Sequence, residues 1–267
     1  MADSPRPKIE ISIRQPLTGV HVAWITIGNE SMLNALNSSL MDQLVGVLRE
    51  AALDEQLRAV VIAGAGEKAF SGGADFRELA RLNAVSARDF ITRLHRACQA
   101  IRDLPVPVIA RIQGYALGAG LELAASCDLR IAADTAIFGM PEVKLGIPSV
   151  IEAALLPSLV GWGRAREILY LGENFDATDA LAWGLVERVV PKVSLDEAVE
   201  QCIESLLRTG PRAIRLQKKL IRSWEDLPLR AAIEAGIDSL AAAYEGDEPR
   251  LAMQNFLAAR RSRKLEH

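Results

Sequence analysis

The sequence contains few of the residues on which disulfide-bonded, zinc-binding and Ser-His-Asp proteins depend. Its three cysteines, Cys98, Cys127 and Cys202, are odd in number and widely spaced, so we expect neither disulfides nor a metal site. Apart from the final residue, the histidines are His21 and His95. The Ser71-Gly72-Gly73 stretch also lacks the nucleophile-elbow pattern, so the sequence gives poor support to a serine hydrolase.

Long apolar runs and an excess of positive charge are also missing. No uninterrupted apolar stretch reaches the roughly 18–20 residues that a membrane span needs, and the first residues lack a signal-peptide pattern. The net charge of −3 leaves no electrostatic footprint for nucleic acid or an anionic membrane. We therefore expect neither nucleic acid nor a membrane as a partner, and the odd, widely spaced cysteines favour a reducing cytoplasm. The terminal residues 265–267 resemble the start of a purification tag and are set aside.

The remaining composition is that of an ordinary globular chain. With 267 residues, 50% hydrophobic and 24% charged, it can bury a full core. In residues 1–193, strand and helix patterns alternate, which predicts an α/β core. Residues 194–264 show helical patterns broken at Gly210-Pro211, Pro228 and Pro249. No low-complexity linker separates the two regions, so we expect one core with an integral helical C-terminal region.

The expected boundaries come from apolar periodicity and capping residues. Strands are predicted at 8–14, 20–27, 59–64, 107–112, 129–133 and 184–190. Ser38 or Ser39 is expected to cap a helix that runs to about Leu53. Ser86 and Asp89 form a capping-box pattern for a helix that ends near Asp103.

Chemical signals are densest in residues 107–146. The predicted strand at 107–112 is followed by three glycines within seven residues, Gly114, Gly118 and Gly120, and then by a helix with Glu122 in its first turn. Glu142 follows twenty residues after Glu122. A strand, a glycine turn and a helix N-terminus direct unpaired N–H groups at one point, which suits an oxyanion. The structural alternative is a tight turn, a solvated Glu122 and a capping or ion-paired Glu142.

Motifs along nearly the whole chain resemble those of the crotonase (enoyl-CoA hydratase/isomerase) superfamily. They are Asn34-Ala35-Leu36-Asn37, the stretch from Ala69 to Asp75, the stretch from Gly114 to Leu123, Cys127-Asp128, the stretch from Phe138 to Glu142, the stretch from Ala182 to Val186, and the stretch from Phe256 to Arg260. The resemblance implies a spiral of ββα units with a trailing helical region. It also implies a homotrimer or dimer of trimers, and acyl-CoA thioesters as substrates without a prosthetic group.

The same resemblance assigns the reacting groups. Backbone N–H groups of Ala74 and Ala119 correspond to the family's oxyanion hole, with Ala119 in place of the usual glycine. Glu122 and Glu142 correspond to the two catalytic glutamates of hydratases. We favour Glu122 as the group that activates water and Glu142 as the proton donor to Cα, and the sequence leaves the exchanged roles open.

The resemblance also places residues along the CoA site. They are Met32, Leu33, Ala35, Lys68, Asp75, Phe76, Arg77, Gly120 and Phe256. No basic residue stands in Ser31-Met32-Leu33, so Lys68 is expected to meet a phosphate. Arg77 is equally well explained as a phosphate contact or as an exposed residue of a polar helix face. For Asp75 we favour a role in holding its loop.

After Glu142 the chain departs from the hydratase pattern. The stretch from Gly146 to Ala153 keeps a proline but lacks the following glycines, so Val150 and Ile151 are expected to narrow the acyl pocket. Glu152 would add a third carboxylate. The leading interpretation is an enoyl-CoA hydratase-type lyase. The alternatives are an isomerase or thioester hydrolase that uses Glu142 alone, and a non-catalytic acyl-CoA-binding or RNA-binding relative. The acidic charge balance argues against RNA.

Overall fold

A computed structural model of the chain describes the backbone of residues 7–265 and the side chains of residues 7–258. These described residues fall into two compact units, one that ends at Ile203 and one that begins at Glu204. In the tag-like terminus, Leu265 ends a helix, and residues 266–267 lie outside the described part.

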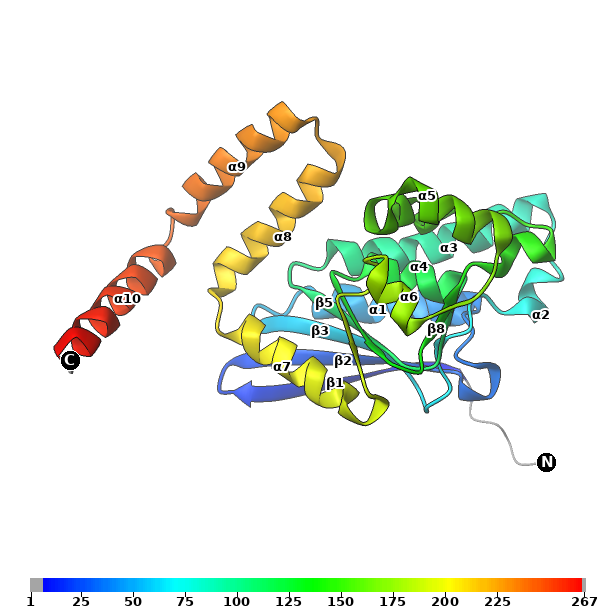
Figure 1. Cartoon of the computed structure of the whole chain (residues 1–267), viewed down its shortest axis with the longest axis horizontal. Helices are drawn as coiled ribbons and strands as arrows, with labels where there is room; N and C mark the ends of the chain where they lie inside the picture. The colour runs from blue at the N-terminus through cyan, green and yellow to red at the C-terminus, as the bar shows by residue number, and fades with distance from the viewer. Residues whose placement is uncertain (1–6, 266–267) are drawn as a thin grey trace. The chain divides into compact units, whose positions relative to one another are not determined.

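The larger sheet of the first unit has the order β1-β2-β3-β5-β7-β10, and Figure 1 labels its first four strands. Its strands are β1 (Lys8–Leu17), β2 (Val20–Gly28), β3 (Leu57–Gly64), β5 (Val108–Ile112), β7 (Leu129–Ala133) and β10 (Arg188–Val190). Strand β1 is antiparallel to β2, and the other neighbours are parallel. The sequence predicts the first five with shifts of a few residues at most. It overextends the sixth, because only residues 188–190 pair with β7.

A smaller sheet contains β4 (Ala69–Ser71), β6 (Tyr115–Leu117), β8 (Ile137–Gly139) and β9 (Phe175–Asp176). Strands β4, β6 and β8 are parallel, and β9 pairs antiparallel with β8. After each of β3, β5 and β7, the chain enters a strand of this second sheet and then a helical segment. This repetition confirms the predicted spiral of ββα units.

Alternation along the strands determines which helices cover each face of the larger sheet. Ala23, Ile25 and Ile27 of β2 belong to the core that includes the apolar sides of α1 (Ser38–Ala51), α3 (Ala84–Asp103) and α4 (Ala119–Ser126). Strand residues whose side chains point to the opposite face, such as Arg14 and Arg111, bond to Glu200 and Asp196 on α7 (Leu195–Leu207). Residues 195–203 of α7 therefore cover the other face (Figure 1).

The remaining elements complete each unit. In the first are α2 (Phe76–Leu79), α5 (Leu156–Leu171), α6 (Ala177–Ala182) and the short 3₁₀ turns η1 (Glu30–Met32), η2 (Pro141–Leu145), η3 (Ile151–Leu155) and η4 (Lys192–Ser194). The second unit contains α8 (Pro211–Asp226), α9 (Leu229–Ala243) and α10 (Glu248–Leu265). Among the described residues, none of the helices combines the length and apolarity needed to cross a bilayer.

Two predicted helix caps are wrong. Asn37 caps α1 by accepting a hydrogen bond from the Leu40 N–H at 2.8 Å. Ser38 does not cap the helix, because its backbone N–H and its hydroxyl both bond to the Glu78 carboxylate. Asn83 caps α3, and Ser86 is the reciprocal member of that capping box rather than its first residue. Both errors shift a boundary by three residues or fewer and leave the helices themselves correctly predicted.

Candidate active site

A cavity of about 530 Å³ lies in the first unit between α2, α3, the N-terminus of α4 and the segment from η2 to Val150. Its apolar wall includes Phe76, Leu79, Leu82, Phe90, Ile91, Leu145, Ile147 and Val150. Of the residues predicted from the sequence, Ala74, Phe76, Ala119, Glu122, Glu142 and Val150 line this cavity. The tertiary structure therefore brings both glutamates and both predicted N–H donors to one apolar hollow.

Two backbone N–H groups at the cavity have no acceptor. Around Ala74, the Leu36 N–H bonds to the Gly73 carbonyl at 2.8 Å and the Asp75 N–H bonds to the Leu36 carbonyl at 2.9 Å. The N–H groups of Ala74 and Ala119 donate to no residue in the described part of the chain. The two segments are adjacent, since a Cβ atom built on Gly73 would lie 3.7 Å from the Ala119 nitrogen. This pair suits an oxygen that gains negative charge.

Glycines allow α4 to begin at this point. Gly118 has φ 49° and ψ −121°, a conformation that costs an L-residue strain, and it directly precedes the first helical residue. A Cβ atom on Gly120 would lie 2.3 Å from the Ser71 carbonyl oxygen, so only glycine permits α4 to pack this closely on β4. The predicted CoA-site residue Gly120 is therefore explained by packing.

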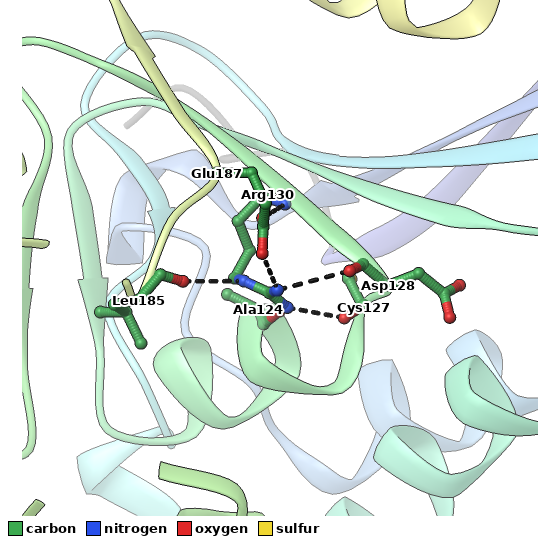
Figure 2. Close-up of polar contacts among 6 residues, drawn as sticks. All are labelled: Ala124, Cys127, Asp128, Arg130, Leu185 and Glu187. Atoms are coloured by element: carbon green, nitrogen blue, oxygen red, sulfur yellow. Dashed lines mark hydrogen bonds and ion pairs between the residues drawn. The ribbon is translucent and has the colours of Figure 1, made fainter. Parts of the chain in front are cut away.

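The opposite end of α4 is fixed by a buried arginine. Figure 2 shows the Arg130 guanidinium among the carbonyl oxygens of Leu185, Ala124, Cys127 and Asp128, and beside the Glu187 carboxylate. The donor–acceptor distances are 2.8 Å to Leu185, 2.7 Å to Cys127, and 3.3 Å to both Ala124 and Asp128. Arg130 is only 3% exposed. It anchors α4 to β7 from the end that faces away from the glycine turn.

Glu122 is buried in the first turn of α4. It is 4% exposed, and its Oε1 atom accepts a hydrogen bond from the Ala153 N–H at 3.1 Å. Burial, followed by the charges of Glu142 and Glu152, raises the pKa of Glu122 to about 8, and the Ala153 hydrogen bond opposes this rise. The net effect is opposite to the ionised form that a helix N-terminus alone favours, because burial outweighs the dipole.

Glu142 stands on η2 and is only partly buried. Its Oε2 atom accepts a hydrogen bond from the Ser149 hydroxyl at 2.8 Å. Burial raises the pKa of this carboxyl, while its own backbone N–H and Ser149 lower it. A Cβ atom on Gly118 would lie 2.2 Å from Glu142 Oε1, so the missing side chain of Gly118 also makes room for this carboxylate.

Glu152 lies on η3 beside Glu122 without lining the cavity. It is 6% exposed, and its Oε1 atom is 2.8 Å from His95 Nδ1 on α3. Its Oε2 atom is buried and has no hydrogen-bond partner among the described residues. The preceding Ile151 has φ 41°, which is rare for a β-branched residue and costs about 1–3 kcal/mol. Ile151 itself does not line the cavity.

The other predicted residues lie off the cavity wall. Asp75 caps α2 by accepting a hydrogen bond from the Arg77 N–H at 2.8 Å. The Arg77 side chain contacts Met32 Sδ at 2.9 Å, which joins α2 to η1. Leu33 and Lys68 are exposed, Ala35 is buried, and Phe256 of the second unit is 60% exposed.

Four contributors to the site are not evident in the sequence. Ser149 and the Ala153 N–H hold the two carboxylates, His95 pairs with Glu152, and Arg88 lines the cavity. Ser149 looks like any loop serine, and the backbone role of Ala153 leaves no side-chain signal. Only the position of Glu152 in an apolar stretch hints at a buried acid. In residues 7–265, no group of three or more His, Cys, Asp or Glu residues is arranged to hold a metal ion.

Comparisons with known proteins show the family and the fold to which this chain belongs. The profile of one family, described as Enoyl-CoA hydratase/isomerase, matches residues 18–264. The chain is 34% identical over 241 residues to a short-chain-enoyl-CoA hydratase of Clostridium acetobutylicum, covering 90% of this chain and 92% of that protein. It is 33% identical over 242 residues to a crotonyl-CoA hydratase of Syntrophomonas wolfei, covering 90% and 93%. The crystal structure of an enoyl-CoA hydratase from Bacillus anthracis superposes with a TM-score of 0.88 at 33% identity, covering 93% and 96%.

Proposed function

Because the chain belongs to the enoyl-CoA hydratase/isomerase family, we propose that it adds water across the 2,3 double bond of a 2-enoyl-CoA thioester. One observation carries this proposal. Two carboxyl groups and two backbone N–H groups without acceptors, those of Glu122, Glu142, Ala74 and Ala119, share a single apolar cavity. Hydration requires these parts: donors for the thioester oxygen, a base for water and an acid for Cα.

The two N–H groups stabilise the charge that develops on the thioester oxygen when water attacks Cβ. Loss of one such donor typically costs about 10²–10³ in rate. The small side chains of Ala74 and Ala119 leave room for the thioester while supplying the N–H groups. The apolar wall accommodates the acyl chain and excludes water from it.

The two carboxyls share the proton chemistry. The pKa of about 8 keeps the proton on Glu122 in the empty site at neutral pH. This resting state favours Glu142 as the acceptor of the proton from water and Glu122 as the donor to Cα, the exchange of roles that the sequence leaves open. The oxygen of water bonds to Cβ, the π electrons take the Glu122 proton at Cα, and the proton then returns from Glu142 to Glu122.

Coenzyme A enters as part of the substrate. Phe76 lines the cavity. The Arg77–Met32 contact brings η1, with neighbouring Leu33 and Ala35, to α2. We place the pantetheine chain along this segment and assign Lys68, Arg77 and Asp75 to its rim. Phe256 is included in the same site on the family resemblance alone.

A double-bond shift is the second candidate, and the neutral state of Glu122 favours it. A carboxyl that remains protonated can hold a proton passively while Glu142 alone moves a proton between two carbons. Thioester hydrolysis and binding without turnover are the remaining alternatives.

Product analysis with crotonyl-CoA, and with a 3-enoyl-CoA for the shift, distinguishes these reactions. Hydration gives a 3-hydroxyacyl-CoA, a double-bond shift gives the other alkene, and hydrolysis gives free coenzyme A. For a hydratase, Glu122→Gln and Glu142→Gln should each lower kcat by about 10²–10⁴. The double variant should lose much less than the product of both losses. Near-full activity of Glu122→Gln with an inactive Glu142→Gln would replace hydration by the one-carboxylate shift.

The proposal includes a homotrimer or a dimer of trimers in the cytoplasm. Five large apolar side chains of α9 and α10 are more than half exposed, namely Ile233, Ile237, Leu240, Leu251 and Phe256. Such apolar surface favours burial between subunits. Light scattering at micromolar concentration should detect the oligomer, and a stable monomer would contradict it. Three widely spaced cysteines favour the reducing cytoplasm.

A further inference from the structure

His95 and Glu152 form a hydrogen-bonded pair that the proposed hydration does not use. His95 Nδ1 lies 2.8 Å from Glu152 Oε1, and the His95 side chain is 49% exposed while that of Glu152 is 7% exposed. The pair therefore connects the surface of α3 to the interior. A carboxyl group buried to this extent requires a compensating interaction, and His95 provides it for one oxygen, while Oε2 has no hydrogen-bond partner in the described part of the chain.

The backbone directs Glu152 inward at a cost. The positive φ of Ile151 immediately precedes Glu152, and a β-branched residue adopts such a conformation only when its surroundings enforce it. The contact between Glu152 and His95 is one interaction that can hold Ile151 in this strained conformation. The backbone strain at Ile151 consequently opposes this conformation of η3, and the contact with His95 on α3 stabilises it.

The next residue transmits this attachment to the active site. Ala153 follows Glu152 in η3, and its N–H donates to Glu122 Oε1 at 3.1 Å. No other hydrogen bond to the Glu122 carboxylate occurs among the described residues. A shift of η3 would therefore release the group at the cavity wall.

We propose that His95 and Glu152 are a positioning pair, in which their hydrogen bond anchors η3 so that the Ala153 N–H holds the Glu122 carboxyl group in its reactive orientation. The proposal rests on the proposed function for the role of Glu122. Neither residue lines the cavity, so they act through Glu122 and not on the substrate.

Several titratable groups surround Glu122 and enter any test by pH. They are Glu142 on η2, Glu152 on η3, and His95 and Cys98 on α3. Burial, followed by the charge of Glu152, raises the pKa of the Cys98 thiol, which keeps it neutral. The pH test therefore replaces the carboxyl group of Glu152 and leaves Glu142 unchanged.

The first experiment needs no substrate. Potentiometric difference titration compares the protein with its Glu122→Gln variant, and the difference gives the titration midpoint of Glu122. With Glu152→Gln introduced into both, this midpoint should fall by about 0.5–1 pH unit, because a neighbouring negative charge is removed. Asp54→Asn is the matched control, because it also removes a carboxylate from a histidine, His21, at 2.6 Å and lies away from the cavity. An unchanged midpoint, or an equal shift in the control, would overturn the proposal.

The second experiment tests the anchor itself. His95→Ala should lower kcat by about 10-fold with little change in KM, because Glu122 loses its orientation. His95→Asn, whose amide nitrogen can replace Nδ1–H, should recover most of this loss. Thermal unfolding of both variants accounts for stability. Equal kcat values for the two variants would overturn the proposal. If the wild-type protein fails to hydrate crotonyl-CoA, the proposed function falls, and the titration still decides whether the pair acts on Glu122.

Discussion

The two ends of α4 are built in opposite ways. At the N-terminal end, the Ala119 N–H has no acceptor, and Glu122 is buried with one hydrogen bond from Ala153. At the C-terminal end, the Arg130 side chain bonds to the carbonyls of Ala124 and Cys127. Unbonded polar groups are therefore concentrated at the end that faces the cavity.

This difference shows how a short helix supports reactive groups. Each buried polar group without a hydrogen-bond partner typically lowers the stability of the folded protein by about 1–3 kcal/mol. They persist here because the rest of the helix is fixed by packing and by Arg130, which leaves it no freedom to rotate and satisfy them. The bonded end should thus control stability, and the open end should control the reaction.

The largest effect is expected at the bonded end. Arg130→Met removes the bonds to four carbonyls and the ion pair with Glu187, and should lower the free energy of unfolding by about 3–5 kcal/mol. Urea unfolding at fixed protein concentration measures it. Arg250→Met, which removes an exposed pair with Asp247, should change stability by less than about 1 kcal/mol. Equal effects of both substitutions would contradict the anchoring role.

At the open end, Glu122→Gln should increase stability at alkaline pH. The folded protein holds the Glu122 proton up to about pH 8, whereas the unfolded chain releases it near 4.5. Stability from this group is therefore full below about pH 4.5 and is lost as pH rises to 8. The variant cannot ionise, so its advantage should grow over this range to as much as about 5 kcal/mol.

Unfolding measured at pH 5 and pH 9 tests this expectation. Glu50→Gln on the exposed face of α1 is the control, for which no comparable pH-dependent gain is expected. A difference between the wild-type protein and Glu122→Gln that stays constant with pH would argue against a buried, protonated Glu122.

Gly118→Ala should affect the reaction more than the fold. Its Cβ atom would lie 2.2 Å from Glu142 Oε1 at a residue with φ 49°, so the carboxylate must move. We expect kcat to fall by about 10²-fold, since small displacements of reacting groups cost that much. Gly46→Ala in α1, with nothing within 4 Å of the added Cβ, should keep full activity. Full activity of Gly118→Ala would show that Glu142 works from another position.

The smallest effect is expected in the loop that follows the open end. Val150 lines the cavity and Ile151 does not, so Val150→Gly should shift the preference towards longer or branched acyl chains. The change in kcat/KM relative to crotonyl-CoA should correspond to about 1–3 kcal/mol. Ile151→Gly should leave chain-length preference unchanged. An equal change of chain-length preference in both variants would contradict the assignment of Val150, and not Ile151, to the cavity wall.

Much of this fold follows from local pattern. The strands at 108–112 and 129–133 are apolar apart from one arginine each, Arg111 and Arg130, a composition close to that of strands buried on both faces. Helix caps were predicted less well, because several polar residues near a helix start can cap it and tertiary contacts decide among them. Ser38 illustrates this, since its backbone N–H donates a hydrogen bond to the carboxylate of Glu78, forty residues away.

The sequence by itself determined the alternation of strands and helices and the presence of two carboxyls beside a glycine turn, since periodicity and spacing are local properties. Its motifs added the resemblance that implied the family and the spiral fold. The tertiary structure decided that Glu122 is protonated near neutral pH, because burial depends on segments that pack against α4 from far along the chain. It likewise decided that Ile151 turns away from the cavity while Glu152 pairs with His95, fifty-seven residues earlier. Electrostatics and side-chain direction depend on neighbours that no local pattern specifies.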